Sequence, residues 1–81
     1  MKQRYEDGIV PEANAAARRE IARQMKQARK ESCLTQQTLA ERIGTRTSNI
    51  SRMESGTYNP SLDFLVKAAA GMGKRVRIVI E

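Results

Sequence analysis

Four side chains near the middle of the chain combine short hydroxyl donors with a guanidinium group, at spacings that place them on the outer side of a helix. They are Thr47, Ser48, Ser51 and Arg52. Ile50 and Met53 fall on the opposite side of the same helix, which makes them candidates for the core. Short polar donors and arginine are groups that reach base edges in the major groove of DNA. The pattern therefore predicts contacts with duplex DNA.

Catalytic and metal-binding chemistry has little support in the composition. The chain has no histidine and one cysteine, Cys33, so it lacks the commonest general base and the mixed ligand sets of zinc sites. We expect no enzyme activity, no metal and no cofactor. A lone cysteine also forms no internal disulfide, and no apolar run approaches the ~20 residues of a membrane span. These features predict a soluble, cytoplasmic protein that does not contact membranes.

A helix-turn-helix motif is expected to position the four donors. A first short helix has apolar residues at a spacing of three and four, namely Leu39, Ala40 and Ile43. Thr35 is its predicted N-cap, and Gly44 is the glycine expected just after its end. The second helix follows within a few residues and closes at Gly56. Two short helices joined by a glycine-led turn are typical of this motif.

The same segment resembles the Xre family of helix-turn-helix regulators, the group related to the phage lambda and Cro repressors. The matching residues are Leu34-Thr35-Gln36, Leu39-Ala40, Gly44, Ile50-Ser51-Arg52-Met53-Glu54 and Gly56. The resemblance runs from about Arg18 to Gly73. It implies an all-α, lambda-repressor-like bundle of about four helices that binds duplex DNA, with residues 1–14 as an N-terminal extension and residues 15–73 as the DNA-binding domain.

The resemblance also implies roles for individual residues. Thr47, Ser48 and Arg52 would face the bases, with Ser51 close by, and Arg52 could form a bidentate contact with guanine. Contacts with DNA phosphates are expected from residues at the start of the two helices and in the loop that follows: Gln36, Arg46, Ser55, Thr57 and Asn59. Tyr58 could either contact phosphate or pack its ring on the domain. Arg46 occupies a position where many relatives have a capping Ser or Thr, so Thr45 or Thr47 could cap instead.

A further pair is implied between the first helix and the end of the second helix of the motif. In the resembling family an arginine late in the first helix pairs with the glutamate after the recognition helix, and the matching residues here are Arg29 and Glu54. Cys33 lies at the junction between the first and second helices, where the resembling family often has glycine. We expect a small buried thiol there.

The first and fourth helices are expected to complete the core. Ile21, Met25 and Ala28 share one face of the first helix, whose other face is basic. That basic face is either solvated or a supplementary phosphate contact, and its members are Arg18, Arg19, Arg23, Lys26 and Lys30. The fourth helix begins after the N-cap Ser61, and its predicted apolar face consists of Leu62, Leu65, Val66 and Ala69. Residues 1–10 are either a frayed terminus or an arm that touches DNA or a partner.

The last eight residues change to a period of two, which predicts a β-strand over 74–81. The core of the predicted strand is Val76, Arg77, Ile78, Val79 and Ile80. One strand alone cannot satisfy its backbone, so we expect it to pair with its counterpart in a homodimer. If that pair centres near Val79, Arg77 faces Glu81 of the second copy. The alternatives are pairing with Ile9–Val10 or with a strand of another protein.

The charge balance agrees with a DNA-binding function. Fifteen Lys and Arg against nine Asp and Glu give a net charge of +6 in 81 residues, which favours a polyanionic partner. We expect a dimeric repressor that recognises an inverted-repeat operator. The small size and the terminal strand resemble antitoxins of the HigA and HipB types, which implies a cognate toxin as partner. The alternatives are a free-standing phage-type repressor and a protein-interaction module without DNA binding.

Overall fold

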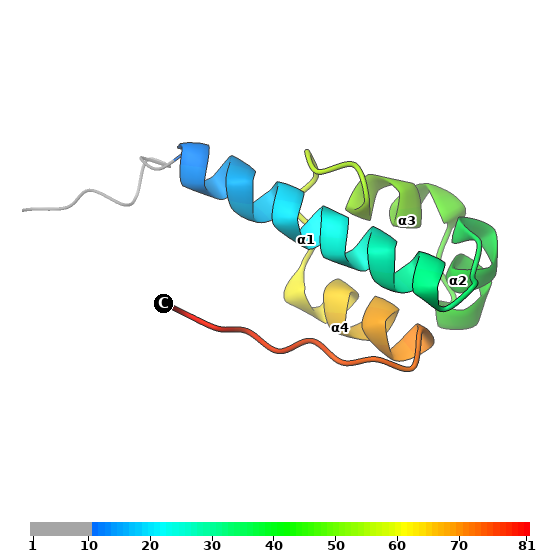
Figure 1. Cartoon of the computed structure of the whole chain (residues 1–81). Helices are drawn as coiled ribbons and strands as arrows, with labels where there is room; N and C mark the ends of the chain where they lie inside the picture. The colour runs from blue at the N-terminus through cyan, green and yellow to red at the C-terminus, as the bar shows by residue number, and fades with distance from the viewer. Residues whose placement is uncertain (1–10) are drawn as a thin grey trace, which may run out of the picture.

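Four helices account for most of residues 11–81, the part of the chain that the computed structural model describes. They are α1 (Pro11–Glu31), α2 (Gln36–Ile43), α3 (Thr47–Met53) and α4 (Leu62–Gly71). Figure 1 shows α1 running along one side of the fold, with α2 and α3 near its C-terminal end and α4 beneath it. The prediction of an all-α bundle of about four helices is therefore confirmed for this part of the chain. The possible N-terminal arm and Ile9–Val10 lie outside the described residues.

The predicted helix boundaries of α2 and α4 depend on side-chain caps that the structure contains. The Thr35 hydroxyl accepts a hydrogen bond of 2.9 Å from the Thr38 backbone N–H, and the Ser61 hydroxyl accepts one of 3.0 Å from the Phe64 N–H. Each hydroxyl thereby satisfies an N–H that has no partner within its own helix. Gly44 follows α2 in the left-handed conformation, with a φ of 71°. These three predictions are confirmed.

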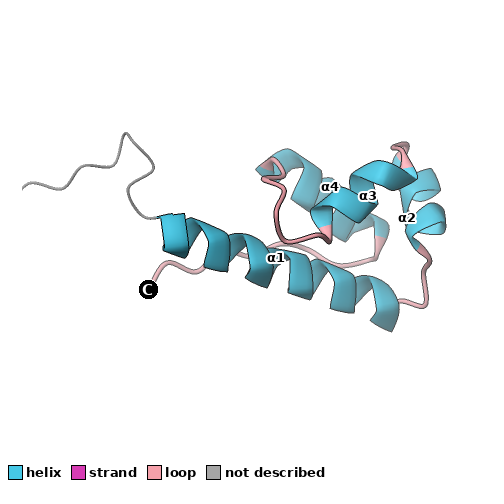
Figure 2. Ribbon diagram, turned by 90° about the horizontal axis from the view of Figure 1, so that it is seen from above, coloured by secondary structure: helices cyan, strands magenta, loops and turns pink. Residues whose placement is uncertain are grey.

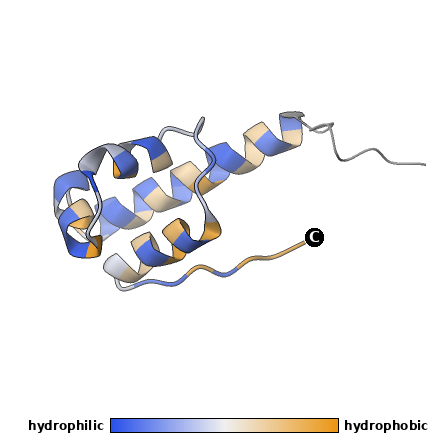
Figure 3. Cartoon of the chain, turned by 180° about the vertical axis from the view of Figure 1, so that it is seen from behind, coloured by the Kyte–Doolittle hydropathy of each residue, from blue (hydrophilic) through white to orange (hydrophobic). Residues whose placement is uncertain are grey.

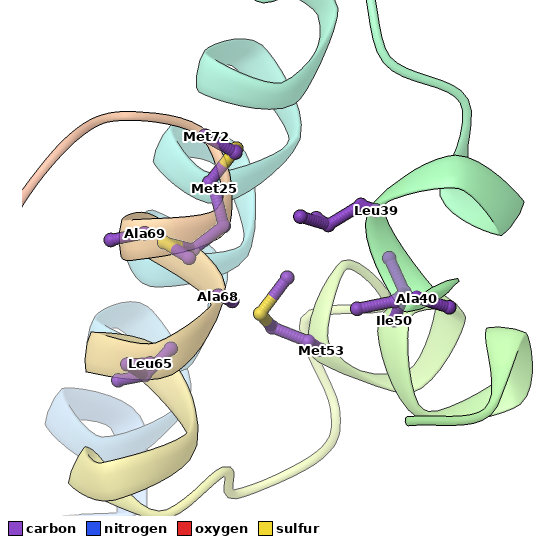
Figure 4. Close-up of a cluster of buried hydrophobic side chains, with 9 residues drawn as sticks. All are labelled: Met25, Leu39, Ala40, Ile50, Met53, Leu65, Ala68, Ala69 and Met72. Atoms are coloured by element: carbon purple, nitrogen blue, oxygen red, sulfur yellow. The ribbon is translucent and has the colours of Figure 1, made fainter. Parts of the chain in front are cut away.

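The core lies where all four helices meet. Leu39, Ile50 and Met53 are its largest fully buried side chains, and Figure 4 shows them facing residues of α1 and α4 across the centre of the cluster. Met25 is the member from α1, and the members from α4 and its end are Leu65, Ala68, Ala69 and Met72. Because α3 contributes two of the three largest fully buried side chains, its position in the bundle is fixed by its inner face.

Gly71 explains how closely α2 and α4 approach each other. A Cβ at this position would lie 2.5 Å from Ile43 Cγ2 and 3.0 Å from Leu39 Cδ1, distances that leave no room for a larger side chain. Arg42 adds a hydrogen bond of 3.1 Å from its guanidinium to the Gly71 carbonyl. The helix-turn-helix is thus packed directly on α4.

Two of the sequence predictions about burial are wrong. Cys33 is exposed and adopts the left-handed conformation with a φ of 58°, because it occupies the position after α1 where the chain reverses and the Leu34 N–H bonds to the Arg29 carbonyl at 3.2 Å. On α4, Leu62 and Val66 are about half exposed, and the buried residue that the pattern missed is Ala68. The small alanine faces the centre because α4 packs close to the other helices.

Residues 74–81 leave α4 through a reversal at Gly73 and run back along it (Figure 1). Gly73 has a φ of 72°, and the Lys74 N–H bonds to the Ala69 carbonyl at 2.9 Å. Val76 packs against the core, whereas Ile78, Val79 and Ile80 are exposed. Figure 3 shows the alternation of hydrophobic and hydrophilic residues along this tail. The predicted β-strand is not present among the described residues of the single chain, since the tail has no strand to pair with there.

Candidate nucleic-acid interface

The outer face of α3 carries all four predicted base-contacting residues. Thr47, Ser48, Ser51 and Arg52 are exposed, whereas Ile50 and Met53 on the inner face are almost completely buried. Figure 2 shows α3 at the surface of the bundle, with α2 next to it. The structure therefore brings these four donors together on one solvent-facing surface of a helix whose other side is anchored in the core.

The turn before α3 differs from the prediction. The N-cap of α3 is Arg46, which forms no capping hydrogen bond with its side chain, so neither Thr45 nor Thr47 is the cap. The Thr45 hydroxyl instead accepts a hydrogen bond of 2.8 Å from the side-chain amide of Asn49. Because no side chain caps this helix, N–H groups in its first turn remain available to an external acceptor such as a phosphate oxygen.

Arg52 lies against the ring of Tyr58, which follows α3 in the connecting loop. The guanidinium carbon is 5.8 Å from the ring centroid, a cation–π geometry. The ring of Tyr58 therefore packs on Arg52, while the residue stays exposed, so a phosphate contact by Tyr58 stays a prediction. The contact restricts the orientations of a long side chain that would otherwise be free in solvent. No sequence pattern indicates this contact, because it depends on the path of the loop.

The loop after α3 is ordered by its own hydroxyl groups. Ser55 donates a hydrogen bond of 2.7 Å to the Arg52 carbonyl, its oxygen lies 3.1 Å from the Thr57 hydroxyl, and it accepts one of 3.2 Å from the Thr57 N–H. Gly56 between them has a φ of 82°, a conformation that suits glycine. Ser55, Thr57 and Asn59 are all exposed, so the predicted phosphate-contacting residues of the loop are accessible directly after α3.

An ion pair connects the end of α3 to α1, at the two positions that the resemblance implies. Arg29 Nε donates to Glu54 Oε2 at 2.6 Å and Nη2 donates to Oε1 at 3.1 Å, while Nη1 donates to the Leu34 carbonyl at 2.7 Å. The hydrogen bond to the Glu54 carboxylate raises the pKa of the Arg29 guanidinium above its usual value. The pair thus satisfies a buried arginine and fixes the end of α3 relative to α1.

Gln36 takes part in the same network. Its side-chain amide nitrogen donates a hydrogen bond of 3.1 Å to Glu54 Oε1, and the residue is half-buried. The sequence predicts a phosphate contact for Gln36 but not this bond. An amide nitrogen carries two N–H groups, so the bond to Glu54 orients Gln36 and leaves a second donor.

Within residues 11–81, no group of three or more His, Cys, Asp or Glu side chains could hold a metal ion. No helix in this part of the chain has the length and apolar character needed to cross a bilayer.

Comparison with known proteins agrees with this geometry. A helix-turn-helix family model matches residues 25–79, which include α2, α3 and α4 entire. The chain belongs to the Xre-like helix-turn-helix family. A relative from Methanothermobacter thermautotrophicus, named as an uncharacterized HTH-type transcriptional regulator, is 44% identical over 46 residues, which cover 57% of this chain and 67% of the relative. No solved structure is a significant match. The helix-turn-helix family model begins at residue 25, so the first part of α1 lies outside it.

Proposed function

We propose that this protein is a sequence-specific DNA-binding transcriptional regulator that inserts α3 into the major groove. The observation that carries the proposal is the division of α3 into a buried inner face and an exposed face of hydroxyl and guanidinium donors. Membership in the helix-turn-helix family and the name of the archaeal relative support the same function. The net charge of +6 favours association with the polyanionic backbone.

Base recognition is assigned mainly to Arg52. Its planar fork matches the O6 and N7 acceptors of guanine, and stacking on Tyr58 at 5.8 Å limits the conformations it must give up on binding. The methyl group of Thr47 can pack against the methyl group of thymine, and its hydroxyl can form a hydrogen bond with a purine or a pyrimidine. Ser48 and Ser51 are short donors beside them, so a contact through either requires α3 to lie deep in the groove.

Phosphate contacts surround this face and fix its register on the duplex. The groups assigned to them are the exposed side chains of Arg46, Ser55, Thr57 and Asn59 and the remaining amide donor of Gln36. Contacts of this kind carry no sequence information. They make the affinity fall steeply as salt rises, because each neutralised phosphate releases counterions.

We further propose that the regulator acts as a homodimer whose C-terminal tails pair as antiparallel strands. Ile78, Val79 and Ile80 are exposed in the single chain, and Leu62 on α4, which lines one hollow together with Ile78 and Val79, is about half exposed. Pairing of the tails would cover this apolar surface and satisfy the tail backbone. A two-fold dimer would present two α3 helices to an inverted repeat whose half-sites are about one helical turn, ~34 Å, apart.

The biological role proposed for this dimer is that of an antitoxin that represses its own operon and binds a cognate toxin. The support is the segment after α4, whose alternating pattern is suited to strand pairing. Of the two alternatives to this role, a free-standing repressor would use the same DNA interface. A protein-interaction module that has lost DNA binding would not use it. A toxin-like gene next to this one favours the antitoxin role, and its absence favours the free-standing repressor.

Binding of two arginine variants to a duplex selected by the wild-type protein tests the DNA interface. Arg52→Ala should relax the preference at one base pair per half-site by ~1–3 kcal/mol. Arg46→Ala is the matched control, and it should weaken binding to all sequences alike. It should also reduce the magnitude of the slope of log K against log salt, by about 0.9 for each phosphate that Arg46 neutralises in the wild-type complex. An Arg52→Ala variant with unchanged affinity and unchanged preference would overturn the assignment.

Sedimentation of a truncated chain tests the dimer. Removal of residues 77–81 retains Val76, which packs against the core, so the bundle should remain folded. The truncated chain should sediment as a monomer at concentrations where the full chain is a dimer. A truncated chain that stays dimeric would contradict pairing through the tail.

A further inference from the structure

The first part of α1 is a feature that the helix-turn-helix family model does not cover. The helix has 21 residues and begins at Pro11, whereas the family match begins at residue 25. Figures 1 and 2 show the N-terminal turns of α1 extending beyond the bundle formed by α2, α3 and α4. Most side chains of these turns are exposed, so core packing does not account for their helical extension.

One point of this extension is in contact with the proposed DNA-binding loop. A Cβ at Gly56 would lie 3.5 Å from Arg19 Cγ, 3.7 Å from Arg19 Cα and 4.0 Å from Ala22 Cβ. The Ser55–Thr57 loop therefore rests on α1 at the turn that carries Arg19. Arg19 is itself exposed, and the base of its side chain lies beside the loop to which phosphate contacts are assigned.

The charges around Arg19 favour an anionic partner. Lys26 lies two turns further along the same face of α1, with the buried Ala22 between them. No carboxylate among residues 12–81 forms a salt bridge with Arg19. Arg23 differs, because Glu20 Oε2 lies 2.6 Å from its guanidinium. This contact lowers the pKa of the Glu20 carboxyl to about 2, mainly through the hydrogen bonds donated by Arg23 and then Gln24.

We propose that Arg19 binds a DNA phosphate just outside the half-site read by α3, so that the extension of α1 lengthens the contacted backbone. The proposal rests on the proposed function, because it takes the Ser55–Thr57 loop to lie against the backbone. In this proposal the DNA strand that contacts the Ser55–Thr57 loop continues past Gly56 and reaches Arg19. The contact is with phosphate alone and adds affinity without adding preference for a sequence.

The salt dependence of binding to a random-sequence duplex tests this assignment. For Arg19→Gln, the slope of log K against log salt should decrease in magnitude by about 0.9, the value for one phosphate contact on duplex DNA. Arg19→Lys keeps the charge and should restore the wild-type slope. Arg23→Gln is the matched control on the next turn, and its slope should equal that of the wild type because Glu20 already binds Arg23.

Three outcomes separate this proposal from the proposed function. A reduced slope for Arg19→Gln, with the preference between selected and random duplexes unchanged, supports the phosphate contact. A wild-type slope for Arg19→Gln in a protein that still binds DNA overturns the contact at Arg19 and leaves the role of α3 intact. A wild-type chain that does not bind duplex DNA at low salt overturns both proposals.

Discussion

Arg29 and Glu54 lie 25 positions apart in the chain, yet two hydrogen bonds of 2.6 and 3.1 Å join their side chains. Their side chains are only 10% and 3% exposed. Glu54 also accepts a hydrogen bond from Gln36 at the start of α2. One carboxylate thus connects α1, α2 and the end of α3, so the pair links the stability of the fold to the placement of the DNA-binding helix.

Removing one partner of this pair should destabilise the protein strongly. We expect Arg29→Ala or Glu54→Ala to lower the free energy of unfolding by ~3–5 kcal/mol, because a buried charge is left without its partner. Urea denaturation monitored by circular dichroism would measure the change. Glu20→Gln, which breaks the exposed pair with Arg23, is the control and should leave the midpoint nearly unchanged. Equal midpoints for Glu54→Ala and the wild type would contradict a structural role.

Cys33 provides a test of the turn between α1 and α2. A non-glycine residue in the left-handed conformation is disfavoured by roughly 1–2 kcal/mol, and Cys33 has a φ of 58°. We expect Cys33→Gly to stabilise the protein by ~0.5–1 kcal/mol, since the greater freedom of glycine in the unfolded chain offsets part of the gain. Cys33→Ser removes the thiol but keeps the strain, and should not stabilise. A thermal midpoint that rises equally for both variants would contradict this explanation.

Tyr58 should affect DNA recognition through Arg52. Tyr58→Phe keeps the ring and should preserve the preference at the base pair read by Arg52. Tyr58→Leu removes the ring and should weaken that preference by ~0.5–1 kcal/mol, the usual size of an exposed cation–π contact. Competition between duplexes that differ only at this base pair would measure the effect. An equally weakened preference in both variants would instead indicate a contact made by the hydroxyl group.

The predictions that succeeded depend on local chemistry. Thr35, Gly44 and Ser61 have capping roles that their residue types and spacing indicate without knowledge of the fold. The two faces of α3 follow in the same way from helical periodicity. The Arg29 and Glu54 positions come instead from the family resemblance, because a separation of 25 residues has no local signature.

The predictions that failed depend on packing between elements. The apolar pattern predicts Leu62 and Val66 in the core because α4 is apolar on several sides, and only its close approach to α2 at Gly71 decides which side is buried. The prediction of a buried Cys33 follows from the usual burial of small thiols, and the chain reversal after α1 overrides it. The tail is a different case: a strand there needs a second strand to pair with, and residues 11–81 of the single chain do not contain one.

Chemical probing of an operator duplex tests the central claim most directly, because dimethyl sulfate methylates guanine N7 in the major groove. The wild-type protein should protect guanine N7 atoms in two patches about one helical turn, ~34 Å, apart, on DNA upstream of its coding region. In the complex with Arg52→Ala, at least one guanine of each patch should become reactive again. Full reactivity of every guanine N7 in the wild-type complex would contradict the insertion of α3 into the major groove.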